Sequence, residues 1–148
     1  MSLGLYLHIP YCFSKCRYCD FYSAPGQRGV PRAYVDALLR ELSRFAPDAP
    51  LRPDTLYFGG GTPSLLDPAD AARLIAAAQP LPGAEITLEA NPDVVTPENL
   101  AGFAAAGVTR ISFGVQSADD AQLHRLGRTH TAAAAAQAFA WAREAGFR

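Results

Sequence analysis

The sequence has no surplus of charge of either sign. Its 148 residues include 13 Lys and Arg against 14 Asp and Glu, which gives a formal net charge of −1 at pH 7. A nucleic-acid partner requires a basic surface that neutralises phosphates, so this balance argues against one. Hydrophobic residues make up 49% of the chain and charged residues 18%. These proportions suit the core of one domain and exclude a disordered chain.

Long hydrophobic runs are also missing. No window approaches the roughly 18 apolar residues that a membrane-spanning helix needs, so we expect no membrane span. The first residues do not form a signal peptide, because no cationic segment precedes an apolar run and His8 and Pro10 interrupt it. We therefore expect a cytoplasmic protein.

Cysteine is scarce, and the three cysteines, Cys12, Cys16 and Cys19, lie close together. A disulfide framework spreads its cysteines along the chain to close loops, and an odd number cannot all pair. This spacing therefore argues against an oxidised, secreted scaffold and indicates a reducing compartment.

Strand-like and helix-like segments alternate along the chain. Hydrophobic periodicity, caps and glycine stops predict strands at 5–9, 55–59, 85–90 and 110–116, and helices at 31–45, 96–107, 118–127 and 131–146. A further helix is predicted to start at 67–68 and to continue through 74–75. Four β-α units in succession predict a parallel α/β sheet with right-handed crossovers. An open doubly wound sheet and a segment of a barrel both fit this order.

The predicted strands alternate apolar and polar residues. Parallel strands that are covered on both faces usually read as continuous apolar runs. Here Leu7 and Ile9, for example, alternate with Tyr6 and His8. Each strand thus has an apolar face for helices and a second face of polar or small residues. The polar residues at the carboxyl ends of the strands predict a ligand site at that edge.

The strongest motif is the CxxxCxxC run from Cys12 to Cys19, in the loop after the first strand. Thiolates are the soft ligands that zinc and iron–sulfur clusters prefer. A structural zinc site needs four ligands, and only His8 lies near enough in sequence to supply the fourth. A four-iron cluster on three cysteines leaves one iron open for a substrate or cofactor. Three reduced, buried thiols are the remaining alternative.

Weaker signals follow the other strands. The Gly59–Gly60–Gly61 turn lets the backbone approach a ligand closely, although a tight turn alone also needs such residues. Glu89 lies near the end of the third predicted strand, where a carboxylate could bind an amine or a ribose hydroxyl. His124 and His130 have no evident partner and are expected at the surface.

Five motifs occur in order: YLHIPYC at 6–12, the CxxxCxxC run, GGGTPS at 59–64, LEANP at 88–92 and GVQS at 114–117. Together they resemble the N-terminal part of radical SAM proteins of the HemW (haem chaperone) type, which are related to oxygen-independent coproporphyrinogen III oxidase. The resemblance covers essentially the whole chain. It implies one radical SAM core domain at 1–148, with four β/α units of a partial TIM-like barrel, truncated on its C-terminal side so that the fourth strand is an exposed edge.

The resemblance also implies cofactors and their ligands. Cys12, Cys16 and Cys19 would hold a [4Fe–4S] cluster whose open iron binds S-adenosylmethionine (SAM). Four further positions match residues beside the cluster or the methionine part of SAM: Tyr6, Tyr18, Gly60 and Glu89. Four others match positions that contact a second cofactor molecule, or its surroundings, in the oxidase relatives: Gly61, Thr62, Gln116 and Arg128.

The function implied is that of a haem-binding chaperone that delivers haem to acceptor proteins. Oxidases of this lineage carry another Cys two residues after the third ligand, whereas Asp20 and Phe21 follow Cys19 here. This departure disfavours porphyrinogen decarboxylation, although radical cleavage of SAM stays open. A coproporphyrinogen oxidase and a zinc-stabilised domain without redox chemistry are the alternatives.

Overall fold

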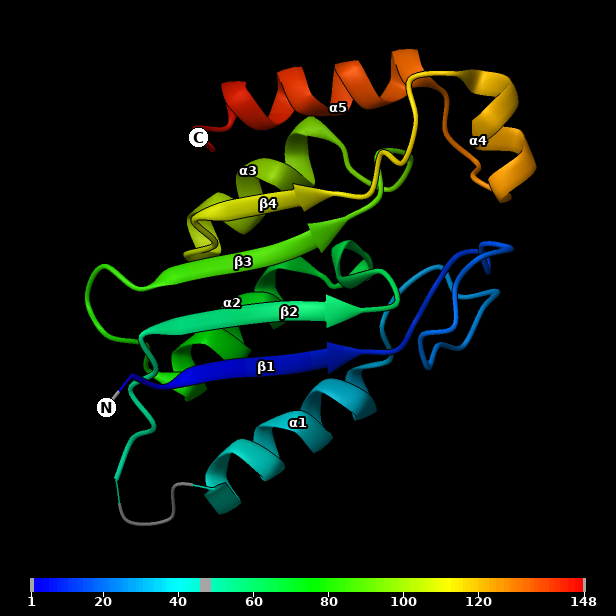
Figure 1. Ribbon diagram of the computed structural model, residues 1–148. Helices are drawn as coiled ribbons and strands as arrows, with labels where there is room; N and C mark the ends of the chain where they lie inside the picture. Colours follow the sequence, from blue (N-terminus) through cyan, green and yellow to red (C-terminus); the bar gives the residue numbers. More distant parts are fainter. Residues whose placement is uncertain (1, 46–48, 148) are drawn as a thin grey trace.

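The computed structural model describes residues 2–45 and 49–147. Within them the chain folds into four strands and five α-helices with one 3₁₀ turn (Figure 1). In chain order these are β1 (Gly4–Ile9), α1 (Arg32–Phe45), β2 (Thr55–Gly60), the 3₁₀ turn η1 (Pro63–Leu65), α2 (Pro68–Ala78), β3 (Glu85–Ala90), α3 (Pro97–Ala106), β4 (Arg110–Phe113), α4 (Asp120–Leu126) and α5 (Ala132–Glu144). The alternating β/α order predicted from the sequence is confirmed.

The four strands form one parallel sheet in the order β1-β2-β3-β4. Each strand therefore lies beside the one that follows it in sequence, and the intervening helix makes the crossover. Because all four strands run the same way, their carboxyl ends meet at one edge, at the arrowheads in Figure 1. The loops that leave those ends are thus brought together by the topology.

The two faces of the sheet differ as the alternation predicts. Ile9, Phe58 and Leu88 are fully buried, on the face that α2 and α3 cover (Figure 1). The alternate residues Tyr57 and Glu89 stand on the other face and are only partly buried. No helix in the described ranges lies across that second face in Figure 1. The polar face is therefore available to a ligand or to further chain.

Helix starts follow the local sequence signals. The Asp67 side chain caps α2 by accepting a 2.8 Å hydrogen bond from the amide of Ala69. Thr96 and Asn99 form a reciprocal capping box at the start of α3. The helix ends at Gly107, whose φ of 103° suits a residue without a Cβ. These caps fix where each crossover begins and ends.

Two predictions about the end of the fourth strand and the histidines require correction. Strand β4 ends at Phe113 and does not reach Gln116, which has a left-handed φ of 71°. His130 is buried instead of exposed, because its Nε2 donates to the carbonyl of Val115 at 3.0 Å and ties the two loops together. His124 lies at the surface, as expected.

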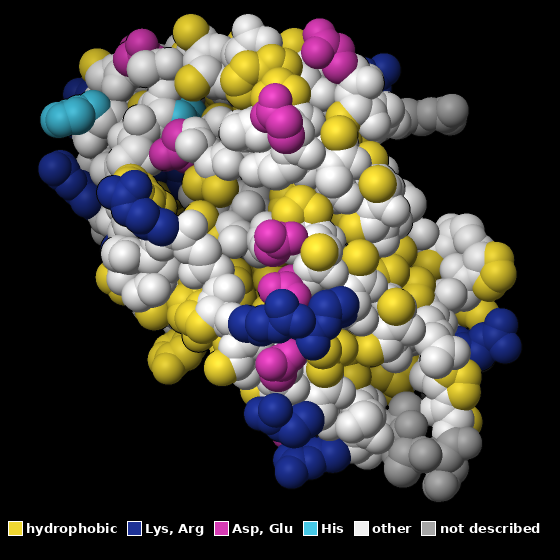
Figure 2. Space-filling model, turned by 180° about the vertical axis from the view of Figure 1, so that it is seen from behind, with side chains coloured by type: hydrophobic (Ala, Val, Ile, Leu, Met, Phe, Trp, Pro, Cys, Tyr) yellow, Lys and Arg dark blue, Asp and Glu magenta, His cyan; other side chains and the backbone are white. Residues whose placement is uncertain are grey.

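Seen from behind, acidic and basic side chains are interspersed over the helical layer (Figure 2). Arg73 of α2, for example, pairs with Asp36 at 2.7 Å and with Asp70 at 2.8 Å. This face therefore carries no field of one sign. Among the described residues, no helix is both long and apolar enough to cross a bilayer.

Candidate functional site

A cavity of about 280 Å³ opens at the carboxyl edge of the sheet. Its walls come from the loop after β1, the ends of β2, β3 and β4, and the segment after α4. Ten of the residues predicted from the sequence line it: Cys12, Cys16, Tyr18, Cys19, Gly60, Gly61, Thr62, Glu89, Gln116 and Arg128. Tyr6 is not part of the lining. It lies on β1, separated from Glu89 by β2, and is half-exposed with its ring stacked on that of Tyr57.

The three cysteines belong to the loop that follows β1, and none forms a disulfide. The loop is pinned to the glycine turn after β2. Gly61 donates its amide to the carbonyl of Ile9, and Thr62 donates to that of Tyr11, both at 2.8 Å. A Cβ on Gly61 would lie 2.6 Å from the Tyr11 oxygen and 2.8 Å from the Cys12 Sγ. The turn is glycine at this point because the cysteine loop packs directly on its backbone.

The end of α4, far along the chain, also contacts the cysteine loop and forms a second clamp on it. The amide of Arg17 donates to the carbonyl of Leu126, the last residue of α4, at 3.0 Å. Gly127 follows in a left-handed conformation, and a Cβ there would lie 3.1 Å from the Arg17 Cγ. The end of α4 thus packs onto the cysteine loop between its second and third thiols.

The donor set fits a multi-iron cluster better than a single ion. A four-iron cluster spaces its thiolate ligands around a larger body than one metal ion does. Within the described ranges, no three His, Cys, Asp or Glu side chains are grouped closely enough to hold one ion. His8, the candidate fourth zinc ligand, has its ring nitrogens 3.1 Å from the Tyr22 carbonyl and 3.3 Å from the Tyr6 hydroxyl. Three free thiols around one cavity remain as soft donors.

Glu89 is oriented by two donors from β2. The Tyr57 hydroxyl donates to its Oε1 at 2.7 Å, and the Gly60 amide donates to its Oε2 at 3.2 Å. The carboxylate is therefore fixed at the cavity wall, where it supplies acceptors for a cationic or hydroxyl group.

Arg128 links the cysteine loop to the other strand ends. Its guanidinium donates to the Cys16 Sγ at 3.3 Å, to Asn91 Oδ1 at 2.7 Å and to the Gly114 carbonyl at 2.5 Å. Its Nε is buried and has no partner among the described residues.

Two residues of this site were not singled out from the sequence. Asn91 bridges Arg128 and Thr62, since its Nδ2 also donates to the Thr62 Oγ1 at 3.2 Å. Its position directly after β3, two residues beyond Glu89, was the available signal. Lys15 holds the cysteine loop in shape by donating to the Phe21 carbonyl at 2.7 Å and to the Ser23 Oγ at 3.1 Å.

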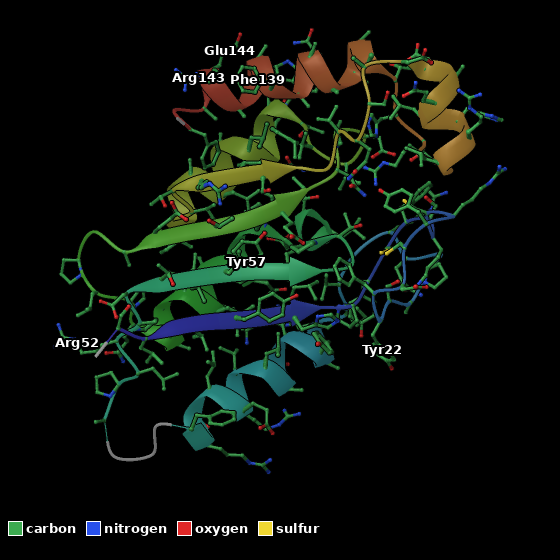
Figure 3. All side chains as sticks on the ribbon, viewed as in Figure 1. Tyr22, Arg52, Tyr57, Phe139, Arg143 and Glu144 are labelled. Atoms are coloured by element: carbon green, nitrogen blue, oxygen red, sulfur yellow. The ribbon has the colours of Figure 1, made fainter. Side chains whose placement is uncertain are left out.

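Aromatic side chains surround the cysteines. Tyr18 lines the cavity, and burial raises the pKa of its hydroxyl, which therefore stays protonated at neutral pH. Tyr22 projects outward from the loop and is 83% exposed (Figure 3). Phe21 is 66% exposed, although it also contributes to the cavity wall.

Comparison with known families decides the assignment. The sequence model of the radical SAM superfamily matches residues 6–148. The chain belongs to the radical SAM superfamily. Its four parallel strands, with helices on one face, are part of the partial TIM-like barrel of this superfamily.

Individual relatives refine this placement. The chain is 40% identical to the haem chaperone HemW of Haemophilus influenzae and 46% identical to that of Escherichia coli, over 99% and 86% of this chain. It is 42% identical to the mitochondrial radical S-adenosyl methionine domain-containing protein 1 of Bos taurus, over 93% of this chain. It spans 41%, 35% and 32% of these three relatives.

A solved structure agrees with the fold. The radical SAM enzyme coproporphyrinogen III oxidase (HemN) of Escherichia coli superposes with a TM-score of 0.87 at 32% identity. The superposition covers 99% of this chain and 35% of that enzyme. This radical SAM chain is thus similar in sequence to the haem chaperones and in structure to the oxidase.

Proposed function

We propose that this chain is the cluster- and SAM-binding part of a haem chaperone of the HemW type. The observation that supports the proposal most is that one cavity is lined by three free cysteines, by Glu89 and by Arg128. When bound and reduced, a [4Fe–4S] cluster would supply the one electron that cleaves the sulfonium bond of SAM. The protein supplies ligands, orientation and exclusion of water.

Each wall of the cavity has a separate task in this proposal. Cys12, Cys16 and Cys19 would hold the cluster, with three thiolates for its four irons. Glu89 accepts hydrogen bonds from the ammonium group of SAM. Gly60 and Gly61 bring backbone to the cavity wall, close to the methionine part of SAM in this proposal.

The first test removes the charge of Glu89. In the anaerobically reconstituted protein, SAM is expected to change the EPR signal of the reduced cluster. Glu89→Gln is expected to raise the SAM concentration needed for half of that change at least tenfold, because a charge-assisted hydrogen bond is lost. Iron content is expected to stay at the wild-type value, since Glu89 is not a thiolate ligand. Loss of iron in this variant would instead assign Glu89 to support of the fold.

Sequence similarity favours a haem chaperone over a coproporphyrinogen oxidase. The relatives at 40–46% identity named above include two haem chaperones, whereas the structurally similar oxidase is 32% identical. Asp20 and Phe21 also stand where the oxidases carry their additional Cys. The proposal includes haem as the ligand, haem-acceptor proteins as the partners and the cytoplasm as the location.

The second test compares the two functions directly. A protein that contains this chain at the full length of its relatives is expected to bind haem and to leave coproporphyrinogen III unconverted. Anaerobic incubation with SAM and a reductant, followed by porphyrin chromatography, measures conversion, and a spectroscopic titration measures haem binding. Accumulation of protoporphyrinogen would make the protein an oxidase.

A further inference from the structure

Tyr57 contacts the site but has no task in the proposed function. It lies on β2, on the face of the sheet that the described helices leave uncovered, and is labelled in Figure 3. We infer that Tyr57 is a positioning residue, which holds the Glu89 carboxylate so that its free lone pairs face a primary ammonium group in the cavity. This inference rests on the proposed function, in which Glu89 binds the ammonium group of SAM.

Two hydrogen bonds fix the orientation of the Glu89 carboxylate. The Tyr57 hydroxyl donates a hydrogen bond to Oε1 at 2.7 Å, and the Gly60 amide donates one to Oε2 at 3.2 Å. Because different donors hold the two oxygens, the carboxylate cannot rotate without losing one bond. An ionised carboxylate offers about four lone-pair sites, so about two remain for a ligand. An ammonium group has three donors and can use both.

Strand register explains how the tyrosine reaches the carboxylate. Tyr57 pairs with Thr87 across the β2–β3 ladder, so Glu89 is its diagonal neighbour two residues further along β3. Residues two apart on one strand share a face, and long side chains bridge such diagonal pairs. The contact is therefore built into the sheet.

Gly59 leaves room for the aromatic ring of Tyr57, because it has no side chain. A Cβ at this position would lie 2.9 Å from Tyr57 Cε1 and 2.7 Å from Tyr6 Cε2, which is closer than carbon atoms tolerate. The Tyr57 ring also stacks on Tyr6, with centroids 5.9 Å apart and planes tilted by 16°. The stack and the missing side chain together direct the hydroxyl toward Glu89.

The proton of this hydrogen bond stays on the tyrosine. Burial, followed by the hydrogen bond and charge of Glu89, raises the pKa of Tyr57 to about 12. The hydroxyl is therefore a donor throughout the neutral range, and the carboxylate is the acceptor.

The test removes one hydroxyl and keeps the ring. In the reconstituted protein, we expect Tyr57→Phe to raise the SAM concentration that gives half of the EPR change about tenfold. This is the size of effect that loss of one hydrogen bond to a charged group produces. Tyr34→Phe is the matched control. It removes a hydroxyl that also makes a 2.7 Å bond, but to the His8 carbonyl, and should leave the SAM titration unchanged.

A double-mutant cycle separates positioning from a general structural role. If Tyr57 acts through Glu89, adding Tyr57→Phe to Glu89→Gln is expected to weaken SAM binding by much less than tenfold. Equal losses in both backgrounds, or an unchanged titration in Tyr57→Phe alone, would overturn the inference while leaving the proposed function intact. If SAM does not alter the EPR signal of the wild-type protein, the proposed function fails, and this inference fails with it.

Discussion

Cys16→Ser is expected to abolish stable loading of a four-iron cluster. Anaerobic reconstitution of the wild-type protein with iron and sulfide should give about four irons per chain and a brown chromophore near 400 nm, as a cubane on three thiolates requires. Serine keeps the size of the side chain but replaces the soft thiolate with a poor ligand for iron. The same loss is expected for serine at Cys12 or Cys19. Iron and sulfide analysis with absorption and EPR spectroscopy measures the outcome.

Ser14→Ala provides the control, because it alters the same loop without removing a thiol, and it should retain the full iron content. One equivalent of zinc that survives the anaerobic iron treatment in the wild-type protein would contradict the cluster assignment and favour the zinc-stabilised alternative.

Gly61→Ala is expected to be nearly as damaging to iron loading, although it removes no ligand. The added Cβ would lie 2.6 Å from a backbone oxygen of the cysteine loop and 2.8 Å from the Cys12 Sγ. Backbone cannot yield as a flexible side chain can, so the loop must move away from the turn. We expect a loss of roughly 1–3 kcal/mol in the free energy of unfolding and displacement of the first thiol. Iron retention and thermal unfolding measure both effects.

The control for this variant is Gly29→Ala. The Cβ of that alanine would meet one atom within 4 Å, the Leu65 carbonyl oxygen at 3.9 Å, which is ordinary contact. It should therefore unfold and load iron as the wild type does. Wild-type iron content in Gly61→Ala would show that the close packing of turn and loop does not matter for the cluster.

Periodicity predicted most of the fold because the signals are local. The strands β1 to β3 and the caps at Asp67 and Thr96 follow from short stretches of sequence. The predicted range of the fourth strand is too long, because the apolar alternation continues through Val115. The ladder to β3, however, ends with the pair of Ala90 and Phe113. Alternation records which side a residue faces, not whether a neighbouring strand is still present.

Long-range contacts account for what the sequence did not predict. His130 is buried because the loop after α4 packs on the loop after β4, and neither segment alone indicates this contact. Asn91 became a site residue only when Arg128 and Thr62 were placed on either side of it. Phe139 on α5 is 60% exposed, although it is a large apolar side chain (Figure 3). The thiol run was predictable because its chemistry depends on residue types at short spacing.

The clamp between α4 and the cysteine loop has a consequence for biosynthesis. The thiols lie near the start of the chain, but the guanidinium that contacts Cys16 lies 112 residues later. At a translation rate of about 10 residues per second, the ribosome needs roughly ten seconds to add that partner. During this interval the nascent chain exposes three reduced thiols in a loop that is not yet closed. Under the proposed function, we therefore expect iron to be loaded after residue 128 has left the exit tunnel.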